Sequence, residues 1–196
     1  MKTCAVIVAG GRSSRMGREK ALETIRGRTI IARIVALLEA QGLEPVINAN
    51  GDVARFAGTG LRVIGDLRTD IQTPLAGLHT ALNFAQERGF DAALTVPSDA
   101  PFLPADLFRK LSGSGRPAIA ASGGQAHYLT GLWPVELLAA LERALSAERL
   151  PRMQDWAKMC DAAIVEWPAI PYDPFFNVNT PEELAEAERI AAEFNL

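Results

Sequence analysis

Cysteine and histidine are scarce in this sequence, with two of each among 196 residues. Neither Cys4 nor Cys160 belongs to a CxxC pair or to a cluster with the spacing of metal ligands. The usual signs of a disulfide framework or a structural zinc site are therefore missing. Cys4 lies within an apolar run, where we expect a small buried hydrophobic residue. This cysteine usage fits a reducing compartment, so we expect a cytoplasmic protein.

Long hydrophobic runs and a strong excess of one charge are also lacking. No apolar stretch approaches the roughly 20 residues that a membrane-crossing helix needs. The first apolar run ends at Ala9, short of even the roughly 7–15 residues of a signal peptide's hydrophobic region. The formal net charge of −3 supplies no overall attraction to nucleic acid. We therefore expect neither membrane nor nucleic-acid binding, and any anion site must be a local concentration of cations.

The sequence does contain a regular alternation of short apolar strands and amphipathic helices. Together with turn residues between them, these patterns predict an α/β fold of three layers: a mostly parallel, Rossmann-like sheet with helices on both faces. Strands are expected at 4–9, 45–50, 61–66, 91–99, 117–122, 128–134 and 162–167, and helices at 29–41, 74–85, 104–112, 135–145 and 179–194. Because no internal repeat or linker interrupts the pattern, we expect one domain spanning 1–196.

The stretch VIVAGGRSSRMGREK, residues 6–20, follows the first predicted strand. Its glycines permit close approach of backbone amides to a phosphate group, and Arg15 and Lys20 would offset the phosphate charge. The stretch is not a P-loop, because Arg18 rather than Lys follows Gly17, and it lacks the GxGxxG spacing of a dinucleotide fingerprint. A tight turn with solvated cations is the alternative explanation.

Two acidic residues end other predicted strands. Asp66 is the last residue of the strand predicted at 61–66, and Asp99 is the last residue of the strand predicted at 91–99. In an open parallel sheet the carboxyl ends of the strands meet at one edge, where ligands bind. Carboxylates beside a phosphate site require a metal or a hydroxyl group to bind, and Mg²⁺ commonly takes one or two carboxylates together with phosphate oxygens and water. Each aspartate alone would more often cap a strand end; their convergence with the cationic loop favours a functional site.

Beyond this chemistry, the sequence resembles the MobA-type nucleotidyltransferases. VAGGRSSRMGREK is similar to the family's loop, approximately LAGGxSxRMGxDK. Further stretches resemble the narrower group of molybdenum cofactor guanylyltransferases in the same order along nearly the whole chain: VINAN, VIGD, TPLAGLHTAL, VPSDAPFLP and FFNVNTPEEL. The opening loop is shared with many nucleotidyltransferases, so the later stretches narrow the choice. The resemblance implies the fold of nucleotide-diphospho-sugar transferases.

The resemblance also implies which residues form the site. The implied nucleotide-binding residues are Val8, Ala9, Gly10, Gly11, Lys20, Asn48, Asp66 and Asp99. Asp99 would also ligate Mg²⁺, and Arg15, Lys20 and Asp99 would form the catalytic set. Asn177 and Asn179 would face the pterin. Residues 1–100 would then be the nucleotide-binding half and 101–196 the acceptor half.

The implied reaction is transfer of GMP from GTP to the phosphate of molybdopterin, with release of pyrophosphate. A phosphomonoester has a second pKa near 6, so the nucleophile is already mostly a dianion at neutral pH and needs no general base. The alternatives are a related enzyme that uses CTP or a sugar-phosphate acceptor, and a non-catalytic nucleotide-binding protein. Molybdenum-insertion proteins and molybdoenzyme chaperones are the implied transient partners.

The sequence departs from the family pattern at several positions. Val8 replaces the usual leucine, Glu19 replaces the common aspartate, and Tyr128 stands where proline often follows the histidine. We therefore assign no role to His127 and expect both histidines to serve packing or surface hydrogen bonding. Two arginines, Arg149 and Arg152, fit either contacts to the pterin phosphate or a solvated helix end, and Trp156 is expected in the core.

Overall fold

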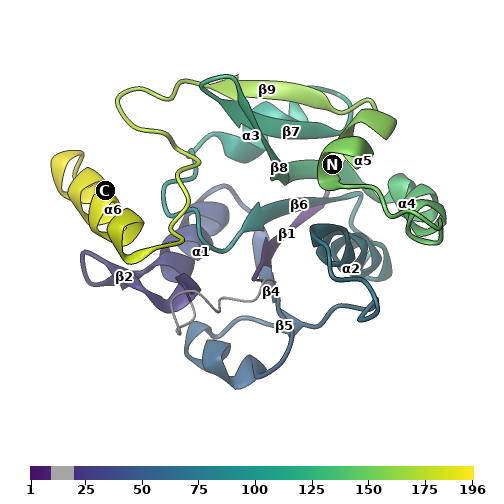
Figure 1. Cartoon of the computed structure of the whole chain (residues 1–196), viewed down its shortest axis with the longest axis horizontal. Helices are drawn as coiled ribbons and strands as arrows, with labels where there is room; N and C mark the ends of the chain where they lie inside the picture. Colours follow the sequence, from purple (N-terminus) through teal and green to yellow (C-terminus); the bar gives the residue numbers. More distant parts are fainter. Residues whose placement is uncertain (10–19) are drawn as a thin grey trace.

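A seven-stranded sheet forms the centre of the molecule (Figure 1). The computed structural model describes residues 1–9 and 20–196. The strand order is β5-β4-β1-β6-β8-β7-β9. The strands are β1 Thr3–Val8, β4 Glu44–Asn48, β5 Val63–Ile64, β6 Ala92–Pro97, β7 Ala118–Ser122, β8 Gln125–Pro134 and β9 Ala163–Trp167. Only β8 runs against its two neighbours, and the other pairings of this sheet are parallel. The predicted mostly parallel α/β sheet is confirmed.

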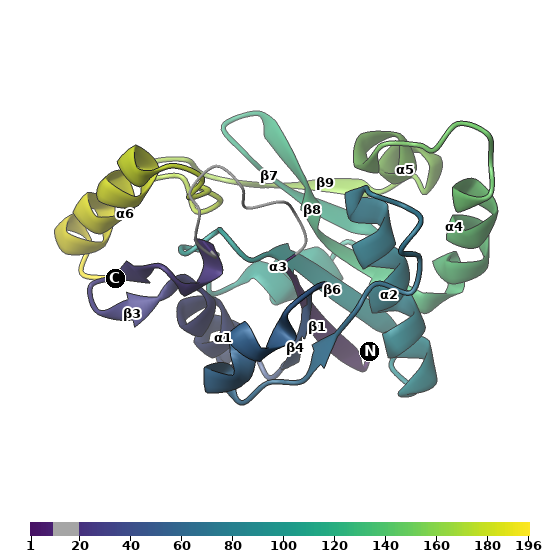
Figure 2. The same ribbon diagram turned by 60° about the horizontal axis from the view of Figure 1, so that its bottom comes forward.

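Helices cover both faces of the sheet and complete the three layers (Figure 1). Buried residues of α1, α3 and α6 pack on one face, and buried residues of α2, α4 and α5 pack on the other. The helices are α1 Ile30–Ala40, α2 Pro74–Glu87, α3 Leu107–Ser112, α4 Leu138–Leu145, α5 Met153–Met159 and α6 Pro181–Glu193. Short 3₁₀ helices lie at η1 Lys20–Leu22, η2 Val53–Thr59 and η3 Val135–Leu137. A hairpin of β2 Thr24–Ile25 and β3 Arg28–Thr29 lies against α6 (Figure 2).

The central strand β1 shows why its sequence is apolar at every position. Successive side chains of a strand point to opposite faces, and here both faces are covered: Ala5 and Ile7 belong to one core, and Cys4 and Val6 to the other. Cys4 is 1% exposed, and burial raises the pKa of its thiol to about 12. The thiol is therefore protonated at neutral pH, and the prediction of a buried hydrophobic cysteine is confirmed.

Helix ends follow their local signals. The Thr29 hydroxyl accepts a hydrogen bond from Ala32 N and begins α1, and Pro74 occupies the first turn of α2. Thr180 and Glu183 form the predicted capping box of α6. Within residues 1–9 and 20–196, none of the helices is both long enough and apolar enough to cross a bilayer.

Candidate active site

The predicted site residues gather at one edge of the sheet. β1, β4, β5 and β6 are parallel neighbours, so their carboxyl ends lie together, and Asp66 and Asp99 each follow one of these ends by two residues. β4 and β1 separate the strands that carry the two aspartates, a spacing of about 14 Å. The aspartates therefore flank the end of β1 and do not touch each other. Gly10, Gly11 and Arg15 lie outside the described residues.

A cavity of about 850 Å³ opens at this edge beside Asp66. Its walls come from the ends of β1 and β4, the loops that follow β4 and β5, and the beginning of α2. It is lined by Val8, Ala9, Asn48, Asn50, Gly51, Arg55, Asp66, Thr69, Ile71, Gln72, Thr73, Pro74 and Gly77. Four of the predicted nucleotide-binding residues thus share one cavity of the size that small-molecule sites have.

Two asparagine side chains orient the carboxylate of Asp66. Asn48 Nδ2 donates to Oδ1 over 2.9 Å, and Asn50 Nδ2 donates to Oδ2 over 2.6 Å. Asn50 Oδ1 in turn accepts the backbone amide of Asp66 over 2.8 Å. Each carboxylate oxygen has further acceptor capacity, so Asp66 presents a fixed pair of acceptors to the cavity.

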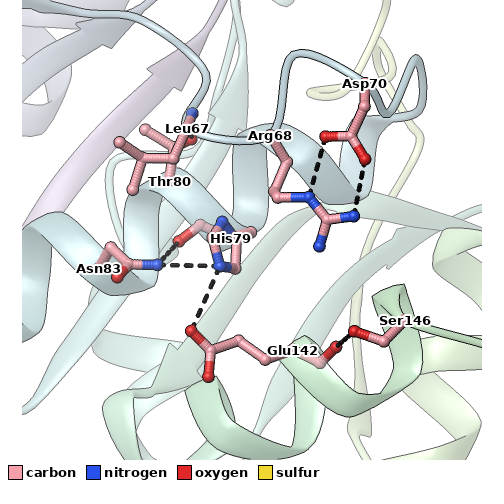
Figure 3. A network of polar contacts seen from close by, with 8 residues as sticks. All are labelled: Leu67, Arg68, Asp70, His79, Thr80, Asn83, Glu142 and Ser146. Atoms are coloured by element: carbon pink, nitrogen blue, oxygen red, sulfur yellow. Dashed lines mark hydrogen bonds and ion pairs between the residues drawn. The ribbon is translucent and has the colours of Figure 1, made fainter.

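Helix α2 packs against the residues that hold Asp66. A Cβ atom added at Gly77 would lie 2.8 Å from Asn48 Oδ1 and 3.0 Å from Val8 Cγ1, so only glycine lets the helix approach the end of β4 this closely. On the same helix, the Thr80 hydroxyl accepts the amide of Leu67 over 3.0 Å and holds the residue after Asp66 (Figure 3).

The backbone of Val8 and Ala9 contributes a wall to the cavity, with its polar groups engaged in strand contacts. Ala9 N donates to Asn48 O over 2.8 Å, and Val8 O accepts Ser98 N over 3.2 Å. The amide of Ala9 is therefore occupied by β4.

A second group of predicted residues surrounds Asp99. Val178 N donates to the carbonyl oxygen of Asp99 over 2.9 Å, and Lys20 Nζ donates to Asn179 Oδ1 over 2.9 Å. Burial raises the pKa of the Asp99 carboxyl above its usual range; the Lys20 ammonium lowers it and the Glu183 carboxylate adds to the rise. The structure thus joins Asp99 and Lys20, which are far apart in the sequence, through the segment that carries Asn179.

The carboxylate of Asp99 fits a magnesium ligand. Its Oδ1 atom is buried and accepts no hydrogen bond from the described residues, a costly state for a charged oxygen without a partner. Within the described part of the chain there is no group of three His, Cys, Asp or Glu residues that could hold a metal ion. A single carboxylate that shares the ion with substrate phosphate oxygens and water is typical of Mg²⁺.

The remaining predicted residues lie around these two groups. Asn177 is exposed, on the segment that leads from β9 to α6. Arg152 bonds to Asp155 in the first turn of α5 and is largely exposed, as expected of a solvated helix end. Trp156 is 1% exposed, so its predicted place in the core is confirmed. Sequence reasoning overlooked the contribution of Asn50 and Gly77, although both stand inside the stretches that carry the family resemblance, VINAN and TPLAGLHTAL.

Comparison with known proteins decides the family. A profile described as MobA-like NTP transferase domain matches residues 5–162. This chain belongs to the MobA-like NTP transferase family. The resemblance noted from the sequence is confirmed. A relative from Rhodopseudomonas palustris, named molybdenum cofactor guanylyltransferase, is 45% identical over 96% of this chain and 94% of its own length.

Solved structures of low identity share the MobA-like fold. Molybdopterin-guanine dinucleotide biosynthesis protein A from Archaeoglobus fulgidus superposes with a TM-score of 0.71 at 22% identity, over 97% of this chain and 99% of its own. A 4-diphosphocytidyl-2C-methyl-D-erythritol synthase from Anaerococcus prevotii gives 0.74 at 15% identity, over 97% and 96%. Because these names differ, the fold alone does not choose the substrates.

Proposed function

We propose that this protein is a molybdenum cofactor guanylyltransferase. It transfers GMP from GTP to the phosphate of molybdopterin, forms the guanine dinucleotide cofactor and releases pyrophosphate. The observation that carries the proposal is the 45% identity to a relative of that name over 96% of this chain. If the protein makes this cofactor, we also expect it to be cytoplasmic and to contact molybdenum-insertion proteins and molybdoenzyme chaperones transiently.

The cavity beside Asp66 is the proposed nucleoside site. Asn48 and Asn50 hold both carboxylate oxygens of Asp66 in place, and guanine offers an N1–H and an exocyclic amine as donors. Ribose hydroxyls are also donors, and the carboxylate serves either group. The positive end of the α2 dipole borders the same cavity at Thr73 and Pro74, which favours an anionic ligand there. Gly10 and Gly11 are proposed to supply phosphate-binding amides beyond Ala9.

The group around Asp99 is the proposed site of charge neutralisation. Asp99, whose buried Oδ1 atom has no hydrogen-bond partner among residues 1–9 and 20–196, would hold Mg²⁺, which when bound neutralises phosphate charge and orients the reacting groups. Lys20 lies beside it and is proposed, with Arg15, to stabilise charge on the pyrophosphate leaving group. Burial makes each of these interactions stronger than in water.

No general base is required for the transfer. The molybdopterin phosphate is mostly a dianion at neutral pH, and one of its oxygens attacks the α-phosphorus of GTP. The new P–O bond forms as the bond to the pyrophosphate oxygen breaks. The main obstacle is repulsion between two anions, so the protein's work is positioning and neutralising charge. Asn177 and Asn179 lie on the segment that bonds to Asp99 and Lys20, and they are proposed to face the pterin.

One assay separates the candidate functions. The protein is incubated with Mg²⁺ and one acceptor, either molybdopterin or a sugar phosphate, and in turn with GTP, CTP, ATP and UTP, and the product is identified by mass. We expect pyrophosphate and the guanine dinucleotide with GTP. A cytidine product would identify a cytidylyltransferase, and turnover only with a sugar phosphate would identify that acceptor. Binding of GTP with no pyrophosphate from any acceptor would indicate a nucleotide-binding protein without catalysis.

A further inference from the structure

A partly buried chain of hydrogen bonds lies outside the two groups of site residues. Ser122 Oγ donates to Asp173 Oδ1 over 2.7 Å and lies 2.7 Å from His127 Nε2. Asp173 Oδ1 also accepts the amide of Phe175 over 2.9 Å. The three side chains come from β7, β8 and the loop after β9, so the chain of bonds links the far half of the sheet to the segment that leads to α6.

An irregular pairing of β7 with β8 brings these side chains together. Ile119 is opposite Gly131, but the next residue, Ala120, is opposite His127. Three extra residues of β8 therefore stand between the two pairs, and an odd number reverses the face to which later side chains point. Ala120 belongs to the core under α1, α3 and α6, and the reversal places His127 on that same face, beside Ser122.

The direction of the hydrogen bonds excludes a nucleophilic serine. The Ser122 hydroxyl donates its one hydrogen to Asp173, so its oxygen is left to accept the Nε2–H of His127. A serine nucleophile requires the opposite polarity, with histidine taking the serine proton. Ser122 is also only 2% exposed. Ser122 and His127 therefore hold Asp173 in place and do not form a catalytic triad with it.

The segment that begins at Asp173 leads directly into the proposed site. Phe175, anchored through Asp173, stacks on the His127 ring with centroids 4.6 Å apart. Further along, Val178 N bonds to Asp99 O, and Asn179 bonds to Lys20. The segment is therefore held at its start by the Ser122–His127 pair and at its end by the group around Asp99.

We propose that Ser122 and His127 are positioning residues that hold Asp173 and thereby fix the segment 173–179, which carries Asn177 and Asn179, against Asp99. The effect on the acceptor rests on the proposed function, whereas the ordering of the segment does not. Neither Ser122 nor His127 lines the nucleoside cavity, and the segment that they hold carries the two asparagines proposed to face the pterin. We therefore expect this chain of hydrogen bonds to affect binding of the acceptor.

The test compares full-length wild-type protein with Ser122→Ala. We expect backbone amides of 173–179 to exchange with solvent about tenfold faster in the variant, the loss expected for one buried hydrogen bond. We also expect the KM for molybdopterin to rise about tenfold, with the Kd for GTP within about twofold of wild type. Asp173→Asn keeps an oxygen that accepts both bonds and should stay close to wild type in exchange and KM.

Thr95→Val is the matched control, because it also removes a buried, hydrogen-bonded hydroxyl, here between Trp133 and the Leu129 carbonyl. It should lower the Tm without faster exchange in 173–179. If Ser122→Ala does not fold, His127→Phe replaces it. This variant keeps an aromatic ring beside Phe175 but loses the N–H donor, and we expect smaller increases in amide exchange and in the KM for molybdopterin. Wild-type exchange in 173–179 would overturn the positioning role. Faster exchange in Ser122→Ala with an unchanged KM for molybdopterin would show that ordering of the segment does not affect acceptor binding. A wild-type protein that is inactive with molybdopterin would instead contradict the proposed function.

Discussion

At the scale of single residues, Asp99 destabilises the fold when it is charged, yet it has a central place in the proposed reaction. Its carboxylate is buried beside Lys20, and burial raises its pKa although the ammonium group opposes the rise. A group that destabilises the fold when charged is typical of a site arranged for a ligand. Activity and stability should therefore respond in opposite directions when this charge is removed.

The first prediction concerns the rate of Asp99→Asn. Loss of the charge removes the proposed magnesium ligand, and we expect kcat for pyrophosphate release to fall about 10²–10³-fold, as for other preorganised electrostatic groups. The measurement is steady-state release with GTP and molybdopterin at saturating Mg²⁺. Asp91→Asn, at the opposite end of β6, is the control. A kcat of Asp99→Asn close to that of Asp91→Asn would remove Asp99 from the catalytic set.

The second prediction concerns the stability of the same variant without substrates. Because the folded-state pKa of Asp99 is raised, its favourable contribution is complete below the ordinary aspartate value of about 4 and is lost as the pH rises through the raised pKa. Asparagine resembles the neutral form at every pH. We therefore expect Asp99→Asn to unfold at higher urea concentration than wild type at pH 7, with the difference vanishing near pH 3. Lower stability of the variant at pH 7 would show that the Lys20 charge outweighs burial.

At the scale of elements, the third prediction concerns Gly77 in α2. Alanine in a helix interior is favoured by about 1 kcal/mol over glycine, yet its Cβ would press on Asn48 and Val8 at 2.8 and 3.0 Å. We expect Gly77→Ala to retain the fold and to raise the KM for GTP about tenfold, because Asn48 must move and Asp66 loses a donor. Gly58→Ala, where an added Cβ meets nothing within 4 Å, is the control. An unchanged KM for GTP would separate Asn48 from the nucleotide site.

The elements also differ in how well their sequences predict them. α1, α2 and α6 carry an N-cap threonine, a first-turn proline or a capping box together with an apolar stripe, so both limits of α1 and α6 and the beginning of α2 were predicted closely. The sequence reading did not propose the β2–β3 hairpin, η2 or α5. The hairpin strands have two residues each and α5 has seven, so each offers few positions for a periodic pattern. β5 and α3 are equally short, but they lie within the longer predicted segments 61–66 and 104–112.

At the scale of the whole molecule, the fourth prediction concerns cooperativity. β6 and β8 pair in one sheet and join strands of residues 1–100 to strands of 101–196, so we expect a single domain with one unfolding transition. All three tryptophans, Trp133, Trp156 and Trp167, lie in the second half and are buried. Tryptophan fluorescence and far-UV circular dichroism should therefore give the same urea midpoint, and GTP should raise both midpoints together. Midpoints that separate, or a fluorescence midpoint indifferent to GTP, would show two independent units.

Taken by itself, the amino-acid sequence determined the α/β class, the buried strands, the main helix limits and the residues at the strand ends. These properties depend on neighbours within a few positions, such as apolar periodicity, caps and glycines. Only the tertiary structure decided which side chains meet: the two amides on Asp66, the approach of α2 at Gly77, and the union of Ser122, His127 and Asp173. Such contacts depend on strand order and on the three extra residues of β8. The strand order and the irregular β7–β8 pairing arise from packing between distant segments, so no local sequence pattern predicts them.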